Sequence, residues 1–198
     1  MQLVFDIETD GFLEDMTKCH VLVCQDVVTK KLYTFTDIKN GLDFMSNAVA
    51  LIGHNIIGFD LMALEKLYGW KPSPKTRLVD TWIMSQTLQF NRSHKHGLAG
   101  WGSYLGYKKM DNSEWAADGF KTYDPRMIDY CINDVKLNTK VYEVLLAELQ
   151  KAIEINDLIK KGLRVEHDVA EFEAVVRKTG WLFDLNKAQE NLRLMTRH

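Results

Sequence analysis

The sequence predicts an α/β fold, a mixed sheet covered by helices and followed by a helical extension. Three observations predict it. β-prone runs alternate with helical patterns up to residue 150, whereas only helical patterns follow. A chain of 198 residues with 46% hydrophobic content can form one good core plus an appendage, but not two catalytic domains. We therefore expect one domain over residues 1–150 and a helical segment over 151–198.

The strands come early in the chain. β-prone runs at 2–7, 19–28 and 31–36 predict three adjacent strands in a meander. Residues 50–53 predict a short buried strand, and Leu78 with Val79 a brief further one.

Helices separate and follow these strands. The spacing of Leu42, Met45 and Val49 predicts a helix, and Phe59 to Tyr68 predicts another that ends at Gly69. Further helices are expected over 83–88, from Gly97 to Leu105, and from Pro125 to about Gln150. Residues 106–124, rich in Gly, Asp, Asn and Lys, predict a long loop, and such loops are often functional.

The segment after residue 150 is purely helical in pattern. Helices are expected over 153–161, 165–179 and 185–196, with Gly162 and Gly180 as breaks. The helical pattern still continues at His198, where the sequence stops without a cap residue. We expect the chain to be part of a longer protein.

Composition restricts the function classes. The formal net charge is −2, so any contact with nucleic acid must be local. The three cysteines form no C-x-x-C pair, which favours a reducing compartment. Neither a secretory leader nor an apolar run of membrane-spanning length occurs. We expect a soluble, intracellular and cytoplasmic protein.

Asp6 and Glu8 are the first candidate site residues. One residue separates them on the first strand, so both side chains point to the same face of the sheet. Paired acids at the end of an apolar strand are either solvated or ligands for a hard metal ion. The pair alone does not decide between these interpretations.

Three later residues have similarly ambiguous patterns. Asp60 lies where it could cap the helix that follows it, and Tyr130 and Asp134 share one helix face at i, i+4 spacing, as many surface pairs do. The acids nevertheless occur at a strand end, a strand–helix junction and a helix interior, in an order compatible with convergence on one sheet edge. If they converge, oxygen-only ligands favour two Mg²⁺ or Mn²⁺ ions, about 3.5–4 Å apart, that clamp a phosphodiester.

Three motifs together resemble a known family. They are Asp6-Ile7-Glu8-Thr9, His54-Asn55 with Phe59-Asp60, and Tyr130 through Asp134. These residues resemble the exonuclease motifs of the DEDD superfamily, tyrosine subgroup, especially the 3′ to 5′ proofreading domain of podovirus-type family A DNA polymerases. The resemblance covers about residues 1–150, and residues 165–184 are similar to the passage from exonuclease to polymerase. It implies a ribonuclease H-like sheet, a truncated start of the polymerase region in 151–198, and an origin in phage-infected bacteria.

The resemblance also implies a role for each matching position. Asp6 would bridge two metal ions, Glu8 and Asp134 would complete the first metal site, and Asp60 would support the second. Tyr130 would place the nucleophilic water. The backbone around Ile7 and Thr9 would meet the 3′-hydroxyl, Phe12 would stack on or wedge between the last bases, and Asn55 would support the strand. From the sequence alone, Phe12 could equally be a loop aromatic that returns to the core.

The expected function is that of a two-metal exonuclease that acts as the proofreading module of a polymerase and releases nucleoside 5′-monophosphates from single-stranded DNA. Its expected partners are a DNA 3′ end and the polymerase domain of the same parent chain, and we expect a monomer. Two alternatives remain open: a 3′ to 5′ exoribonuclease, and a non-catalytic module that binds 3′ ends. The basic cluster from Arg92 to His96 is expected to be solvated or to touch DNA phosphate.

Overall fold

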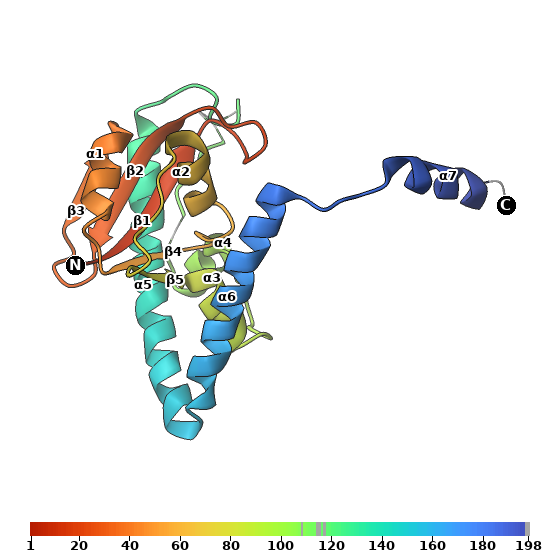
Figure 1. Cartoon of the computed structure of the whole chain (residues 1–198). Coiled ribbons are helices and arrows are strands. Elements are labelled where there is room, and N and C mark those ends of the chain that lie inside the picture. Colours follow the sequence, from red (N-terminus) through yellow and green to blue (C-terminus); the bar gives the residue numbers. More distant parts are fainter. Residues whose placement is uncertain (108, 114–115, 117, 197–198) are drawn as a thin grey trace.

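A computed structural model of the chain describes residues 1–107, 109–113, 116 and 118–196. Within these residues five strands and seven helices follow one another (Figure 1). They are β1 (Gln2–Thr9), β2 (Cys19–Asp26), β3 (Leu32–Phe35), α1 (Ile38–Met45), β4 (Ala50–Gly53), α2 (Asp60–Tyr68), β5 (Arg77–Asp80), α3 (Thr81–Leu88), α4 (Leu98–Tyr104), α5 (Arg126–Ile155), α6 (Leu158–Thr179) and α7 (Leu185–Met195).

The strands form one mixed sheet in the order β3-β2-β1-β4-β5. The meander β1-β2-β3 is antiparallel, while β4 and β5 extend the sheet in parallel from the other side of β1. The sheet and its helical layers confirm the predicted α/β architecture. β1 lies at the centre, so residues on either of its faces are covered by helices.

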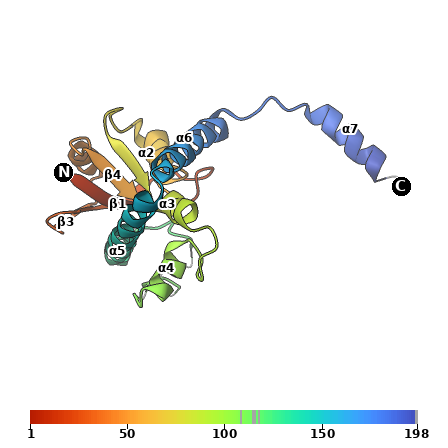
Figure 2. The same cartoon turned by 90° about the horizontal axis from the view of Figure 1, so that it is seen from below.

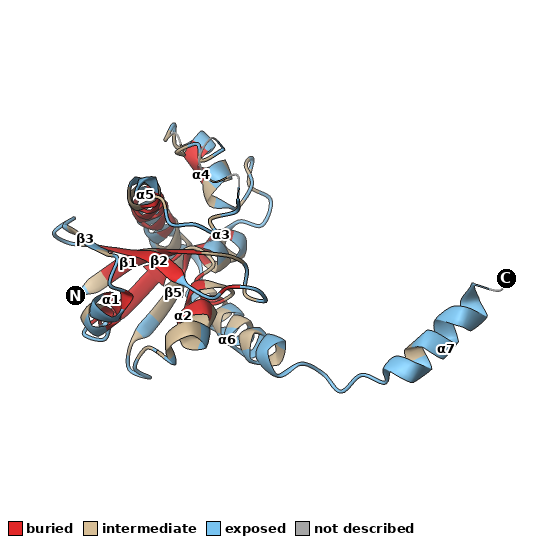
Figure 3. Cartoon of the chain, turned by 90° about the horizontal axis from the view of Figure 1, so that it is seen from above, coloured by how far each residue is buried: buried red, intermediate tan, exposed pale blue. Residues whose placement is uncertain are grey.

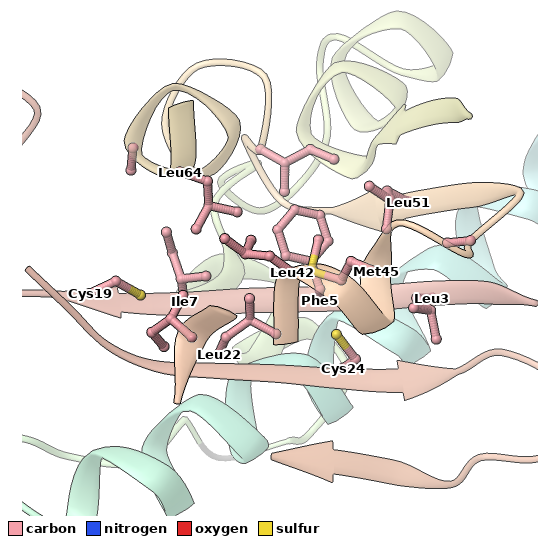
Figure 4. Packing of buried hydrophobic residues seen from close by; sticks show 14 of the residues in the cluster. Leu3, Phe5, Ile7, Cys19, Leu22, Cys24, Leu42, Met45, Leu51 and Leu64 are labelled. Carbon is pink, nitrogen blue, oxygen red and sulfur yellow. The ribbon is translucent and has the colours of Figure 1, made fainter. Parts of the chain in front are cut away.

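The two faces of β1 have different surroundings. Leu3, Phe5 and Ile7 enter an apolar cluster with α1 and α2, shown in Figure 4. Val4 points the other way, into a second cluster with α3, α4 and α5. Figure 3 shows α5 and α4 on one side of the sheet and α1 and α2 on the other. Because side chains alternate along a strand, Asp6 and Glu8 share the face of Val4, toward α5.

Helices α5 and α6 form an antiparallel hairpin beside the sheet (Figure 1). In Figure 2, α6 leaves the tip of α5, passes α3 and ends beside α2. The expected break at Gly162 is wrong, since α6 continues through it. The break lies at Asn156, whose extended backbone ends α5 and whose side chain accepts a hydrogen bond from the Leu158 amide.

Two other boundaries differ from the expectation. α1 begins and ends four residues earlier than the apolar spacing from Leu42 to Val49 indicates, and Val49 is 61% exposed beyond its end. α7 follows Gly180, which has a φ of +71°, and contains no buried residue. It extends away from the rest of the chain (Figure 1). Residues 197–198 at the end of the expected extension lie outside the described residues.

No described helix combines the length and the apolar character needed to cross a membrane.

Candidate active site

Asp134 faces the acidic side of β1 because it lies on the buried stripe of α5. Its neighbours Cys131 and Val135 are fully buried in the cluster beneath that face. Asp134 itself is 5% exposed, and Tyr130 lies one turn earlier and is half-buried. The interpretation of Tyr130 and Asp134 as a surface pair is therefore wrong.

Asp60, the first residue of α2, interacts electrostatically with Asp6. It is 4% exposed, and the N-cap position belongs to Phe59, which makes no side-chain cap. The helix-cap interpretation of Asp60 is therefore wrong. Glu8 is also buried, at 8% exposure, so the solvated-end interpretation of the strand pair does not hold for it. The sheet and two helices thus bring four carboxylates, Asp6, Glu8, Asp60 and Asp134, into one electrostatically interacting cluster.

Burial and mutual repulsion make the four acids reluctant to ionise. Burial, and then the charge of Asp134, raise the pKa of Asp6 to about 7. Burial and the charge of Asp6 hold the pKa of Glu8 and of Asp60 well above their usual ranges. Burial also raises the pKa of Asp134, although Lys109 opposes the shift. A cluster of this kind stores repulsion that a cation of high charge would relieve.

One oxygen of the cluster has no hydrogen-bond partner. Asp134 Oδ1 is buried and unpartnered among the described residues. Buried polar atoms are nearly always satisfied, so an orphan needs an explanation such as an ion. A carboxylate oxygen of a residue that interacts electrostatically with Asp6 and Glu8 suits a hard divalent cation. The residues present therefore fit a divalent metal.

Cys131 lies beside the acids but is not suited to bind such an ion. Its thiol donates to the backbone oxygen of Asp6 at 3.4 Å and to Oδ2 of Asp6 at 3.6 Å. Asp6, Glu8 and Cys131 have ligand atoms within 4.8 Å of one another. Burial, then the nearby acids, raise the pKa of the thiol well above its usual range, so it stays protonated. Hard cations prefer oxygen, and we therefore assign the carboxylates, not the sulfur, as ligand candidates.

Lys109 is the site residue that the sequence did not reveal. Its Nζ lies 2.8 Å from Oδ2 of Asp134 and 5.1 Å from the ring centroid of Tyr130, and its side chain hydrogen bonds to that of Tyr130. The ion pair with Asp134 outweighs burial and raises the pKa of Lys109 above its usual range. Lys109 belongs to the loop after α4, and the only signal for it was the unusual length of that loop.

Asn55 lies in a loop that Asp80 holds in place. Asp80 accepts hydrogen bonds from the backbone of Asn55 at 2.9 Å and of Ile57 at 3.2 Å, and it also caps α3. Asn55 has a φ of +63°, a left-handed conformation that Asn tolerates. Its side chain lies over Gly58, where a Cβ would come within 2.5 Å of Asn55 Oδ1. This packing turns the chain into α2 and so places Asp60.

Asp80 is fixed in turn by α6. His167 accepts a hydrogen bond from the Asp80 amide at 3.0 Å through Nε2, and its Nδ1 contacts the Leu163 carbonyl at 2.8 Å. α6 therefore packs on the domain and supports the site loop. The expected domain boundary at residue 150 lies inside α5, which ends at Ile155. The residues after α5 form α6, which packs on the domain, and α7, which projects from it.

Phe12 lies on a loop that follows the acidic strand. Asp10 holds this loop through the amides of Thr17 and Lys18, at 2.8 and 2.9 Å, and Met16 anchors it at 2% exposure. Phe12 is 77% exposed, so its ring is outside the core. Thr9 hydrogen bonds to the Gly11 carbonyl, and the Ile7 side chain is buried. The proposed contacts of Ile7, Thr9 and Phe12 with a strand remain predictions.

The basic cluster from Arg92 to His96 has mostly internal partners. Arg92 forms a bidentate ion pair with Glu148 and lies over the ring of Trp101, with a side chain that is 4% exposed. His94 stacks on Tyr104, and His96 contacts Ser85. The expectation of a solvated or DNA-binding cluster is wrong for Arg92, because its charge is used within the fold.

Comparison with known proteins adds sequence relatives. No protein-family profile matches the chain. DNA-directed DNA polymerases of Escherichia phage T7 and Enterobacteria phage T3 are each 25% identical over 240 residues, which cover 95% of this chain and 34% of the relative. The chain therefore spans about a third of the length of these relatives.

Solved structures share the fold. Brucella melitensis NrnC bound to pGG matches with a TM-score of 0.67 and 19% identity, over 93% of this chain and 88% of that one. Escherichia coli RNase D, an exoribonuclease involved in structured RNA processing, matches with a TM-score of 0.59 and 18% identity, over 86% of this chain and 45% of that one. These structures show that the chain shares a ribonuclease H-like fold, and the phage polymerases support the resemblance to the exonuclease domain of a polymerase.

Proposed function

We propose that this chain is a 3′ to 5′ exonuclease domain that removes terminal nucleotides from single-stranded DNA as nucleoside 5′-monophosphates. The observation that carries the proposal is the cluster of four carboxylates, of which Glu8, Asp60 and Asp134 are buried and Asp6 is partly buried, with Asp134 Oδ1 lacking a partner among the described residues. Acids buried together at such a cost have a use that a purely structural role does not supply. A phosphodiesterase that depends on divalent cations is the use that these ligands suit.

Each carboxylate has a place in this proposal. Two Mg²⁺ or Mn²⁺ ions would be held by Asp6, Glu8, Asp60 and Asp134, and Asp6 would contribute to both sites. When bound, such ions activate water and stabilise the leaving oxygen of a phosphodiester. Tyr130, one turn from Asp134, orients the attacking water through its hydroxyl. The exposed Phe12 contacts the last bases by stacking, which is worth roughly 1–3 kcal/mol per base and tolerates any base.

The choice of DNA rests on the sequence relatives, which are DNA-directed DNA polymerases. We propose that the chain works as a monomeric proofreading module beside the polymerase domain of its parent chain, inside an infected bacterial cell. An exoribonuclease is the second candidate, because RNase D shares the fold. A non-catalytic module that binds 3′ ends is disfavoured, since it would not need all four acids.

The test uses 5′-labelled DNA and RNA strands of the same sequence, mixed with the chain and Mg²⁺. The proposal predicts stepwise shortening of DNA from the 3′ end and release of 5′-monophosphates. Asp6→Asn combined with Glu8→Gln should abolish the shortening, while the exposed Asp43→Asn should leave it unchanged. Faster shortening of RNA than of DNA would favour the second candidate. Absence of shortening, or shortening by the double variant, would refute both.

A further inference from the structure

Lys109 brings a positive charge to the acid cluster from a loop. Its Nζ pairs with Oδ2 of Asp134 at 2.8 Å, while Oδ1 of the same carboxylate stays unpartnered among the described residues. The lysine therefore occupies one oxygen of Asp134 and leaves the other available. Because different oxygens are involved, a cation at Oδ1 and Lys109 at Oδ2 are compatible.

The same ammonium contacts Tyr130, the proposed water-positioning residue. The two side chains hydrogen bond, and Nζ lies 5.1 Å from the ring centroid. An ammonium has three donors, and among the described residues Asp134 and Tyr130 are the acceptors that Lys109 contacts, which leaves one donor for a further acceptor. Lys109 thus contacts both residues of α5 that the proposed function places at the reacting end of a strand.

The positive charge of Lys109 suits an anionic ligand such as a phosphodiester. A phosphodiester is an anion, and four carboxylates repel it. The field of Lys109 reaches Asp6, Glu8 and Asp134, where it opposes their mutual repulsion. A fixed ammonium beside a developing negative charge on phosphorus is a recurrent means of stabilising phosphoryl transfer. A lysine serving only to anchor the loop would not need to lie against both Asp134 and Tyr130.

We propose that Lys109 binds a non-bridging oxygen of the scissile phosphate, which joins the 3′-terminal nucleotide to the rest of the strand, while it holds Asp134 and Tyr130 in position. This proposal rests on the proposed exonuclease function and adds a residue to it. It makes Lys109 part of the substrate site. The phosphate oxygen accepts the remaining hydrogen bond, and the ion pair with Asp134 persists.

The experiment compares Lys109→Met and Lys109→Arg with the wild-type chain. Lys31→Met is the matched control, because Lys31 makes a similar contact with the Tyr33 ring, at 5.0 Å, away from the acids. Three quantities are measured: the single-turnover rate of strand shortening, the affinity for thymidine 5′-monophosphate in the presence of Mn²⁺, and the affinity for Mn²⁺ alone by electron paramagnetic resonance.

Lys109→Met should lower the rate by about 100-fold, the loss that follows removal of one donor to a developing charge. It should weaken thymidine 5′-monophosphate binding roughly tenfold, as expected for a lost charge-assisted hydrogen bond. Mn²⁺ alone should bind no more weakly than to the wild type, since removal of a neighbouring cation does not disfavour a metal ion. Lys109→Arg should recover part of the rate, and Lys31→Met should match the wild type.

Unchanged nucleotide affinity in Lys109→Met would overturn the proposal. So would a parallel loss of Mn²⁺ binding, because Lys109 would then only organise the acids. If Lys109→Met does not fold, Lys109→Gln is measured in the same way, and failure of both to fold would also overturn it. A wild-type chain that shortens no strand would refute the proposed function, while the nucleotide affinities would still decide the role of Lys109.

Discussion

The two faces of β1 differ in chemistry although they belong to the same eight residues. One face carries Leu3, Phe5 and Ile7 into a core with α1 and α2. The other begins with Val4 and continues as Asp6 and Glu8 toward α5. The first face stabilises the fold, and the second collects charges that disfavour it. The contrast shows that one strand can be a structural and a chemical element at once, because its side chains alternate.

The largest effect should come from breaking the acidic face. Asp6→Asn keeps the size of the side chain and removes its charge. The variant should therefore shorten DNA at least about 10³-fold more slowly than the wild type, in line with the several kcal/mol that bound metal ions supply. The measurement is the single-turnover rate, with circular dichroism as the check on folding. Asp43→Asn, an exposed acid on α1, is the control. A rate within tenfold of the wild type would remove Asp6 from the site.

A substitution on the apolar face should lower stability strongly and the rate per folded molecule only weakly. Phe5→Ala removes a fully buried ring and should lower the free energy of unfolding by about 3–5 kcal/mol. Chemical denaturation measures the loss. The rate per folded molecule should change far less than in Asp6→Asn. The two faces would not be functionally distinct if both variants lost the same free energy of unfolding and the same fraction of the rate.

The pH dependence of stability should sharpen the contrast. Burial raises the pKa of Asp6 from 3.8 to about 7, so the folded state binds its proton more tightly than the unfolded state does. Its contribution to stability is fully present below about pH 4 and is lost as the pH rises through about 7. In EDTA, stability should therefore fall between pH 5 and pH 8, on the order of 2–4 kcal/mol.

Groups with lowered pKa act outside this window. Hydrogen bonds lower the pKa of Asp10 and of Asp26, so their contribution is lost only as the pH falls toward acid. Asp6→Asn should flatten the profile between pH 5 and pH 8, and saturating Mn²⁺ should do so in the wild type. Stability that rises over this range in EDTA would contradict the account of the acid cluster.

A smaller effect is expected for Tyr130, which lies at the margin of the acidic face. Tyr130→Phe keeps the ring and removes the hydroxyl, and should slow strand shortening about 10- to 100-fold by misplacing the attacking water. Stability should change little. The comparison is Tyr33→Phe, on β3 in the other cluster. Equal rates for the two variants would leave Tyr130 without a role in water placement.

The sequence predicted the strand-based parts of the site because their geometry is local. Alternation along β1 places Asp6 and Glu8 on one face. Asp134 was ambiguous, because its spacing from Tyr130 also suits a surface pair, and its burial is seen only in the folded chain. Asp60 was ambiguous, since a carboxylate at a strand–helix junction is compatible with capping. Its burial depends on the left-handed Asn55 and on Asp80, which is distant in sequence.

Contacts that join distant segments could not be predicted. Lys109 reaches Asp134 across 25 positions, and nothing in its own loop encodes the partner. Arg92 was assigned to a solvated cluster because Glu148, its partner, lies on a different helix. Gly162 was expected to break a helix, but α6 is held by packing on α3 and α5 and tolerates it. In each case tertiary structure overrode local preference.

Metal binding is the most direct test of the central claim that the four acids form a divalent-cation site. Mn²⁺ titration by isothermal calorimetry in the absence of DNA should show two ions bound per wild-type chain, with protons released from the acids on binding. Asp6→Asn, which removes a carboxylate proposed to bind both ions, should lose at least one of them. A wild-type chain that binds no Mn²⁺, or an Asp6→Asn variant that binds two as tightly, would contradict the account.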